Sequence, residues 1–232
     1  MLVRYVVITG VSRGLGEALV NQFETDPETV VVALGRTFSD AQRIAAGPRL
    51  ILRHCDLAEP ASMPHAAELS ETLADADEVI LIHNAAVVDP IGRIGDLAVD
   101  DLATAVAVNL TAPILLTNSL LAALPDTARE VLVMFVSSGA AHRIIDGWSA
   151  YSATKRGAEE FFAHLAEQYA DDPRVRVEVV NPGVMDTGMQ ETIRSADFAG
   201  RQRFLDLFEN DELPDPSAVA ARLVEEHVTR PA

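Results

Sequence analysis

The segment LVRYVVITGVSRGLG, residues 2–16, decides how this chain folds. Its first part is apolar and rich in β-branched residues, which predicts a buried strand over residues 2–9. Three glycines follow it, Gly10, Gly14 and Gly16. An amphipathic pattern over residues 17–24 then predicts a helix. A strand, a glycine turn and a helix in this order let the backbone approach a pyrophosphate at the helix N-terminus, although glycines also end strands for structural reasons alone.

The rest of the chain alternates short apolar segments with helical patterns. Strands are predicted at residues 30–34, 49–53, 78–83, 130–136 and 175–180. Helices are predicted at residues 60–74, 99–124, 148–169 and from about residue 218, with Pro113 bending the second. This alternation is typical of one α/β domain with a parallel sheet, here residues 1–232. Residues 186–213 are either a flap closing over a substrate or a helix pair packed on the core.

Composition excludes several classes of function. The net charge of −17 leaves no basic surface for a nucleic acid. The single cysteine, Cys55, and the lack of paired His or Cys motifs predict no disulfide and no metal site. Neither a signal peptide nor an uninterrupted apolar run of about 20 residues is evident, so we expect a cytoplasmic protein without a membrane span.

Tyr151 and Lys155 carry the strongest chemical signal. They are four residues apart on a predicted helix, so the ammonium and the phenol lie on one face. A nearby positive charge favours the phenolate and should lower the pKa of Tyr151, making it a general acid and base. The motif also arises by chance on amphipathic helices. Lys155, however, is the only lysine in a chain whose other basic residues are all arginine, and a compact ammonium differs from a planar guanidinium.

Two arginines favour NADP(H) as the cofactor. Arg36 follows the second predicted strand, where an NAD-binding unit usually carries an acidic residue for the ribose hydroxyls. A guanidinium there suits a 2′-phosphate, and Arg13 lies within the glycine turn. The alternative is that both are solvated surface side chains. Asp56 and Asn84 follow two further strands and are candidates for adenine and ribose contacts, whereas we interpret His83 and Cys55 as structural.

The chain resembles the short-chain dehydrogenase/reductase family. The matching residues are Thr9-Gly10-x3-Gly14-x-Gly16, Asn84-Ala85-Ala86, Asn109, Ser138, Tyr151-x3-Lys155 and Pro182-Gly183-x3-Thr187. The resemblance implies a doubly wound sheet in order 3-2-1-4-5-6 with helices on both faces. It implies that Tyr151 is the acid and base, Lys155 holds the nicotinamide ribose, Ser138 orients the carbonyl and Asn109 supports a water-linked proton path. The implied cofactor-binding residues are Gly10, Ser12, Arg13, Gly14, Leu15, Gly16, Arg36, Asp56, Leu57, Asn84, Ala85, Ala86, Tyr151, Lys155, Pro182, Gly183, Val184 and Thr187.

Two departures from the family pattern concern the cofactor side and the sheet edge. His83-Asn84-Ala85-Ala86 replaces the usual Asn-Asn-Ala-Gly, and Ala86 adds a methyl group where the backbone passes the cofactor. A seventh edge strand is also expected to be absent. The family suggests a homodimer through the Asn109 and Tyr151 helices, although these helices could be buried against the sheet alone.

The segment Pro182–Gln190 is similar to the sepiapterin reductase and benzil reductase branch. It predicts an NADPH-dependent carbonyl reductase acting on a small aromatic or bicyclic vicinal dicarbonyl compound. Expected substrate contacts are Ile144, Ile145, Trp148, Met185 and Met189, with Asp186 or Gln190 adding polarity. The alternatives are a reductase of a sugar, an alcohol or a 3-oxoacyl thioester, or a dinucleotide-binding regulatory or scaffold protein without turnover.

Overall fold

Six parallel strands form one sheet in the order β3-β2-β1-β4-β5-β6. The fold is taken from a computed structural model that describes residues 2–229. The strands are β1 Arg4–Thr9, β2 Thr29–Gly35, β3 Leu50–His54, β4 Glu78–His83, β5 Glu130–Val136 and β6 Val175–Val180. This order confirms the doubly wound sheet, and across the described residues the sheet ends at β6 without a seventh strand.

Alternate side chains of each strand enter two separate cores, as the pleat requires. On one face Val7, Leu81 and Val133 pack with helices α3, α5 and α6; on the other, Ile8 and Ile80 pack with α1 and α9. Both faces are covered, which explains why the strands are nearly continuous apolar runs.

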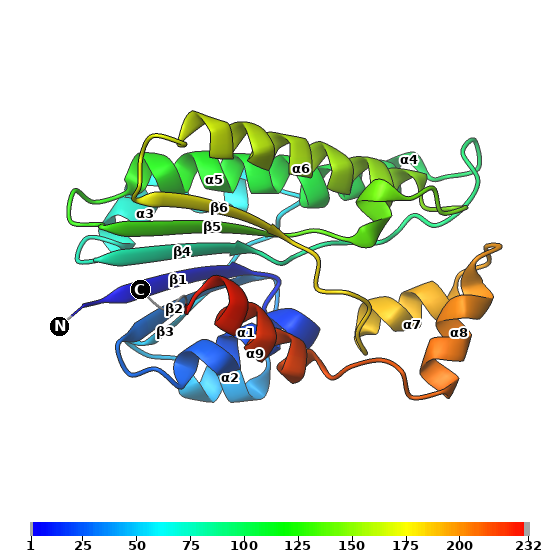
Figure 1. Ribbon diagram of the computed structural model, residues 1–232, viewed down its shortest axis with the longest axis horizontal. Coiled ribbons are helices and arrows are strands. Elements are labelled where there is room, and N and C mark those ends of the chain that lie inside the picture. Colours follow the sequence, from blue (N-terminus) through cyan, green and yellow to red (C-terminus); the bar gives the residue numbers. More distant parts are fainter. Residues whose placement is uncertain (1, 230–232) are drawn as a thin grey trace.

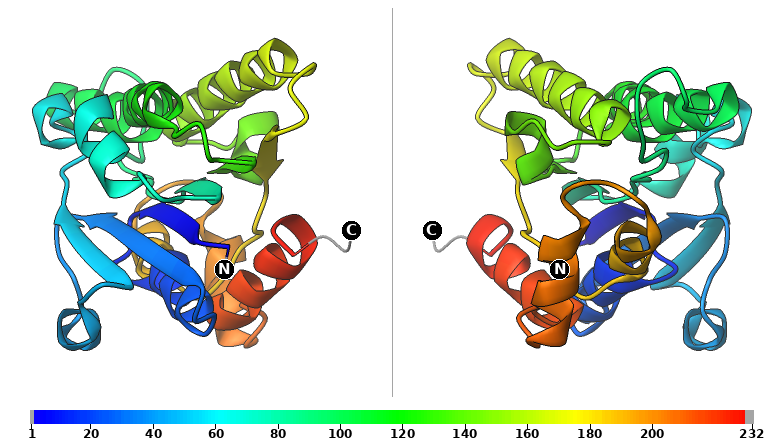
Figure 2. Two further views of the ribbon diagram at one scale, coloured as in Figure 1. Left: turned by 90° about the vertical axis from the view of Figure 1, so that its left-hand side faces the viewer. Right: turned by 90° about the vertical axis from the view of Figure 1, so that its right-hand side faces the viewer.

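Helices flank the sheet in two layers, and a helix pair stands apart from both. The helices are α1 Gly14–Glu24, α2 Asp40–Ala45, α3 Ala66–Thr72, α4 Val99–Val106, α5 Ala112–Ala123, α6 Ser149–Gln168, α7 Gly188–Ser195, α8 Arg201–Glu209 and α9 Pro216–His227. Figure 1 shows α5 and α6 above the sheet, α1, α2 and α9 below it, and α7 and α8 beyond the carboxyl ends of the strands. Figure 2 shows the twist of the sheet between the two layers.

The helices differ from the predicted ones in three places. The prediction of one helix over residues 60–74 was wrong, because the structure has a 3₁₀ turn at Pro60–Ser62 and then the separate helix α3. Pro64 lies between them and has no N–H with which to continue the first turn. The short helix α2 was not expected. The helix predicted over residues 99–124 contains a π-helical turn at Ala107–Thr111, where the Ala112 N–H donates to the Ala107 carbonyl just before Pro113.

The continuous helix Val99–Ala123 is long and apolar enough to cross a membrane by length and composition alone. Polar residues such as Asp100, Asp101 and Asn109 interrupt it, so it is not an uninterrupted apolar run. Its buried residues Leu116 and Leu120 pack on the sheet with β4 and β5, so this is the core helix of an α/β domain, which passes the same test.

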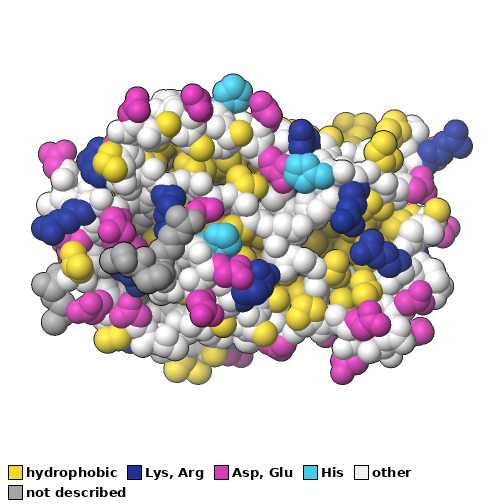
Figure 3. Space-filling view, in the orientation of Figure 1, with side chains coloured by type: hydrophobic (Ala, Val, Ile, Leu, Met, Phe, Trp, Pro, Cys, Tyr) yellow, Lys and Arg dark blue, Asp and Glu magenta, His cyan; other side chains and the backbone are white. Residues whose placement is uncertain are grey.

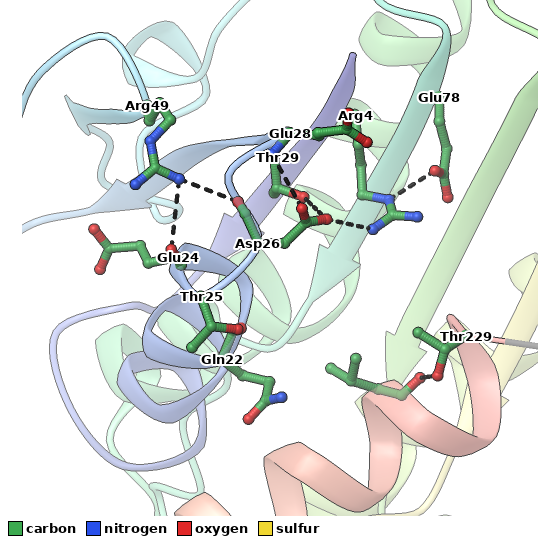
Figure 4. A network of polar contacts seen from close by, with 11 residues as sticks. Arg4, Gln22, Glu24, Thr25, Asp26, Glu28, Thr29, Arg49, Glu78 and Thr229 are labelled. Atoms are coloured by element: carbon green, nitrogen blue, oxygen red, sulfur yellow. Dashed lines mark hydrogen bonds and ion pairs between the residues drawn. The ribbon is translucent and has the colours of Figure 1, made fainter. Parts of the chain in front are cut away.

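A polar network closes the amino-terminal edge of the sheet (Figure 4). Arg4 at the start of β1 donates to Glu78 on β4 at 2.6 Å and to Asp26 before β2 at 3.0 Å. Asp26 also accepts a hydrogen bond from the Thr29 hydroxyl at 2.9 Å. These contacts fix the strand register at the end opposite the glycine turn.

Candidate active site

The carboxyl ends of the strands open into a cleft of about 860 Å³. It is bordered by the glycine turn, the segments after β2 to β6, the start of α6 and the helix pair α7–α8. Every residue expected to bind a cofactor lines it: Gly10, Ser12, Arg13, Gly14, Leu15, Gly16, Arg36, Asp56, Leu57, Asn84, Ala85, Ala86, Tyr151, Lys155, Pro182, Gly183, Val184 and Thr187. One cleft therefore brings together residues from both halves of the chain.

The glycine turn packs so closely against neighbouring backbone that a side chain would clash. A Cβ on Gly16 would lie 2.1 Å from the Gly10 carbonyl oxygen, and a Cβ on Gly10 would lie 2.8 Å from Cα of Ala85. Gly10 also has φ of +71°, a conformation that residues with a side chain rarely adopt. The bare backbone at the start of α1 suits the pyrophosphate of a dinucleotide.

Asn84 is used by the protein itself. Its amide group donates to the carbonyl oxygens of Thr9 and Gly10 at 3.0 and 3.1 Å. The Thr9 hydroxyl accepts hydrogen bonds from the Asn84 and Ala85 backbone N–H groups, both at 3.1 Å. Asn84 thus binds the segment after β4 to the glycine turn, a structural role that the sequence did not indicate.

Tyr151 and Ser138 form the polar centre of the cleft. Tyr151 lies in the first turn of α6 and is 5% exposed, and Ser138 follows β5. Burial raises the pKa of Tyr151 above its usual value, and a hydrogen bond with the Ser138 hydroxyl acts in the opposite direction. The expected lowering by Lys155 is not what the structure shows, because desolvation of the phenol is the largest effect.

Lys155 is 1% exposed, and its ammonium donates to the Val136 carbonyl at 2.7 Å. Nζ lies 5.9 Å from the centre of the Tyr151 ring and 4.7 Å from that of Phe135. Burial lowers the pKa of Lys155 to about 7, and the charge of Glu159 opposes this shift. The lone lysine is therefore a buried base that titrates near neutrality.

Asn109 lies in the π-helical turn but does not line the cleft. Its Oδ1 accepts from the Val87 N–H at 2.9 Å, and its Nδ2 donates to the Val87 carbonyl at 2.8 Å and to the Thr154 hydroxyl at 3.2 Å. The side chain holds the segment after β4 against α6. The side-chain amide of Asn109 is therefore already engaged by Val87 and Thr154. It has no free group to offer a proton path.

Aromatic side chains build the other end of the cleft. The Trp148 ring stacks on Phe204 with centroids 5.5 Å apart and meets Tyr151 edge-on at 5.6 Å. Phe198 and Ile193 complete this buried cluster, so residues 186–213 form a helix pair whose apolar side packs beside the polar centre. The segment therefore contains a helix pair that packs on the protein and borders the cleft, and its closure over a substrate stays a prediction.

Most of the expected substrate contacts line the cleft, but not all of them do. Ile145, Trp148, Met185, Met189 and Gln190 line the cleft. Ile144 does not: its side chain is fully exposed, so that prediction was wrong. Neighbouring isoleucines in an extended segment point to opposite sides, and periodicity alone could not tell which one faces inward. Asp186 lies in a smaller hollow with Glu17 and Glu191 that adjoins the cleft at Gly14, Thr187 and Gly188.

Several residues of the cleft were not expected from the sequence. They include Thr104 and Val108 on the helix after β4, Arg143 beside the Ser138 turn, and Arg203 on α8. Charged residues lining the cleft are five basic and one acidic: Arg13, Arg36, Arg143, Lys155, Arg203 and Asp56. Figure 3 shows Lys and Arg side chains beside the apolar surface on the right of the molecule, with acidic side chains spread around its rim.

The geometry agrees with comparisons to known proteins. A family model for short chain dehydrogenases matches residues 4–197. The chain belongs to the short-chain dehydrogenase/reductase family. It is 35% identical over 229 residues to a benzil reductase ((S)-benzoin forming) of Bacillus subtilis (strain 168), covering 94% of this chain and 90% of that protein.

Two further similarities span nearly the whole chain. A sepiapterin reductase of Mus musculus is 30% identical over 236 residues, covering 94% of this chain and 89% of that protein. The crystal structure of the KRED1-Pglu enzyme superimposes with a TM-score of 0.84 at 30% identity, covering 99% of this chain and 96% of that one. The chain is thus a short-chain oxidoreductase of the benzil and sepiapterin reductase branch, in a family that uses nicotinamide dinucleotides.

Proposed function

We propose that this protein is an NADPH-dependent carbonyl reductase that acts on a small aromatic or bicyclic vicinal dicarbonyl compound. One observation carries the proposal. The paired hydroxyls of Tyr151 and Ser138 lie beside the aromatic wall formed by Trp148 and Phe204 in the same cleft. A cleft that is apolar except at one polar pair suits a ligand with flat apolar rings and one reacting oxygen.

The side chains have distinct roles in this reaction. The bound cofactor supplies the hydride. Ser138 donates a hydrogen bond to the carbonyl oxygen and orients it beside Tyr151, whose hydroxyl gives up the proton. A raised pKa keeps Tyr151 protonated, which is the state a proton donor needs. A carbonyl beside a second carbonyl is electron-poor, so polarisation by two hydroxyl groups suffices.

Lys155 argues against a protein that only binds a dinucleotide. Burying an ammonium is costly, and a scaffold protein has no need for one beside a phenol. As a cation next to Tyr151, Lys155 holds the cofactor ribose and stabilises the phenolate that remains after proton transfer. This favours turnover over a purely regulatory role.

Arg13 and Arg36 support NADPH over NADH. Both line the cleft, and the structure assigns no carboxylate partner to either within residues 2–229. The Arg13 guanidinium lies against Gly188 at the start of α7, where a Cβ would be only 2.9 Å from Nη1. An additional phosphate would give these guanidinium groups a charge-assisted partner, with each contact contributing about 1.5 to 3 kcal/mol before screening.

Steady-state kinetics with a substrate panel test the proposal. The panel contains benzil, 1-phenyl-1,2-propanedione, sepiapterin, a β-ketoacyl thioester and a sugar ketone, each with NADPH and with NADH. We expect the highest kcat/KM with NADPH and one of the first three compounds. Preference for the thioester or the sugar contradicts the substrate assignment, and equal use of both cofactors contradicts the role of the two arginines.

We also propose a cytoplasmic homodimer. Val106 and Leu115 on the α4–α5 helix are 44% and 39% exposed. Large apolar side chains exposed on this helix are candidates for contacts in a subunit interface. Analytical ultracentrifugation should give twice the mass of one chain, and replacing Leu115 with Glu should give the single-chain mass.

A further inference from the structure

The buried ammonium of Lys155 requires a compensating negative charge. From β5, the Val136 carbonyl accepts a hydrogen bond from it at 2.7 Å. From β4, His83 faces it, but this imidazole is hydrogen-bonded to Thr117, and burial lowers its pKa to about 3, so it is neutral. Tyr151, on the same helix, is also neutral. Within residues 2–229, the carboxylate whose charge acts on Lys155 is that of Glu159.

Glu159 lies one helical turn after Lys155, on the same face of α6. One oxygen accepts a hydrogen bond from the Ser137 hydroxyl at 2.5 Å. The other lies 2.9 Å from His142 Nε2 and 3.9 Å from an Arg156 guanidinium nitrogen. With 14% of its side chain exposed, this carboxylate is held by the end of β5, by the Gly139–His142 turn and by its own helix.

Ser137 lies in the chain between two residues that contact Lys155 and Tyr151. The carbonyl of Val136 before it accepts a hydrogen bond from Lys155, and Ser138 after it is the hydrogen-bond partner of Tyr151. A carboxylate that anchors Ser137 therefore sets the distance between the end of β5 and α6 at the point where both contacts form. The same carboxylate supplies the charge that the lysine needs.

We propose that Glu159 is a positioning residue of the proton-transfer site, which fixes the end of β5 through Ser137 and keeps Lys155 as an ammonium. The effect on turnover rests on the proposed function, whereas the effect on the charge of Lys155 does not. Burial has already lowered the pKa of Lys155 to about 7, so losing the opposing charge would leave mostly neutral amine at neutral pH.

The single lysine makes the charge directly measurable. Protein labelled with lysine carrying ¹³C at Cε gives one lysine signal, whose pH titration reports Lys155 alone. In Glu159→Gln we expect the midpoint to fall by about one pH unit, the lower end of the effect of a neighbouring opposite charge. Glu160→Gln is the matched control, because it removes the same charge from a side chain that is 69% exposed and pairs with His164. An unchanged midpoint in Glu159→Gln, or an equal fall in Glu160→Gln, overturns the proposal.

The pH dependence of kcat is a second measurement, independent of the lysine titration. The decline of kcat on the alkaline side should move to lower pH in Glu159→Gln by the same amount as the lysine midpoint. Ser137→Ala keeps the carboxylate but removes its 2.5 Å hydrogen bond, so it should lower kcat while shifting the lysine midpoint less than Glu159→Gln does. If the Lys155 midpoint moves but the alkaline decline of kcat stays at the same pH, Glu159 is not linked to proton transfer.

Failure of the proposed function would be recognised separately. A wild-type protein without reductase activity rejects that function, while the lysine titration still tests Glu159. If Glu159→Gln does not fold, Arg156→Gln replaces it. This variant removes the positive charge that lies beside the Glu159 carboxylate, so the titration midpoint of Lys155 should rise. A midpoint that stays or falls in that variant overturns the proposal.

Discussion

Backbone groups form one end of the cleft, and aromatic side chains form the other. The end near the glycine turn is made of backbone groups at strand termini, where Gly10 and Gly16 leave no space for a Cβ. The other end is made of aromatic side chains from distant segments, with Trp148 at the start of α6 against Phe204 on α8. The first end depends on local backbone geometry, and the second depends on how α7 and α8 pack. Variants at each end should therefore fail in different ways.

Tyr151→Phe, where the two ends meet, should have the largest effect. It removes the transferable proton but keeps the ring that packs against Trp148. We expect kcat to fall by about 10³-fold, within the range of general acid catalysis, while the Kd for NADPH changes little. Stopped-flow turnover and fluorescence titration of NADPH measure the two quantities. A variant with more than a tenth of the wild-type kcat would show that another group donates the proton.

Gly16→Ala tests the glycine end. Its Cβ would lie 2.1 Å from the Gly10 oxygen and 2.5 Å from Asn84 Nδ2, so the turn must move. We expect a loss of about 1 to 3 kcal/mol in the free energy of unfolding, as for other overpacked sites, together with loss of cofactor binding. Gly157→Ala in α6 is the matched control. Its Cβ would lie at an ordinary contact distance of 3.5 Å from the Leu110 side chain, and helix propensity favours alanine over glycine by about 1 kcal/mol. Similar urea midpoints for the two variants would contradict the close approach in the turn.

Trp148→Ala tests the aromatic end. Removing the indole takes away the surface that packs on Phe198 and Phe204. We expect kcat/KM for benzil to fall by about 10 to 100-fold, corresponding to roughly 1.4 to 2.8 kcal/mol of lost apolar contact, with an unchanged Kd for NADPH. Ile144→Ala, at a fully exposed side chain in the same loop, should leave both values unchanged. An equal effect of the two variants would remove the distinction between the two ends of the cleft.

A pH dependence of stability follows from the buried lysine between the two ends. Lys155 has a pKa of about 7 in the folded protein and 10.5 as its model value, so between these values the unfolded chain binds the extra proton. Stability due to this group is therefore fully present above about pH 10.5 and is lost as the pH falls towards 7. Lys155→Met should be more stable than the wild type at pH 6, with the difference shrinking at pH 9. Urea unfolding at both values measures it, and a constant difference would exclude a depressed lysine pKa.

What the sequence could predict follows the same division. Glycines, strand ends and the Tyr151–Lys155 spacing act over a few residues, so the strand order and the residues of the glycine end were predictable. The roles of Asn84 and Asn109 were not, because their partners, Thr9 and Val87, are set by contacts across the sheet. The orientation of Ile144 and the placement of Phe204 on Trp148 likewise depend on tertiary packing. Glu159 lies one turn from Lys155, but only the structure shows that Ser137 holds it.

The most direct test of the central claim compares two substrates that share both phenyl rings. Benzil carries two adjacent carbonyls, and deoxybenzoin carries one. We expect the purified protein to oxidise NADPH with benzil, giving benzoin, and deoxybenzoin to react at least about 100-fold more slowly, close to 3 kcal/mol in activation free energy. Equal rates on the two ketones, or no NADPH oxidation with benzil, would contradict it.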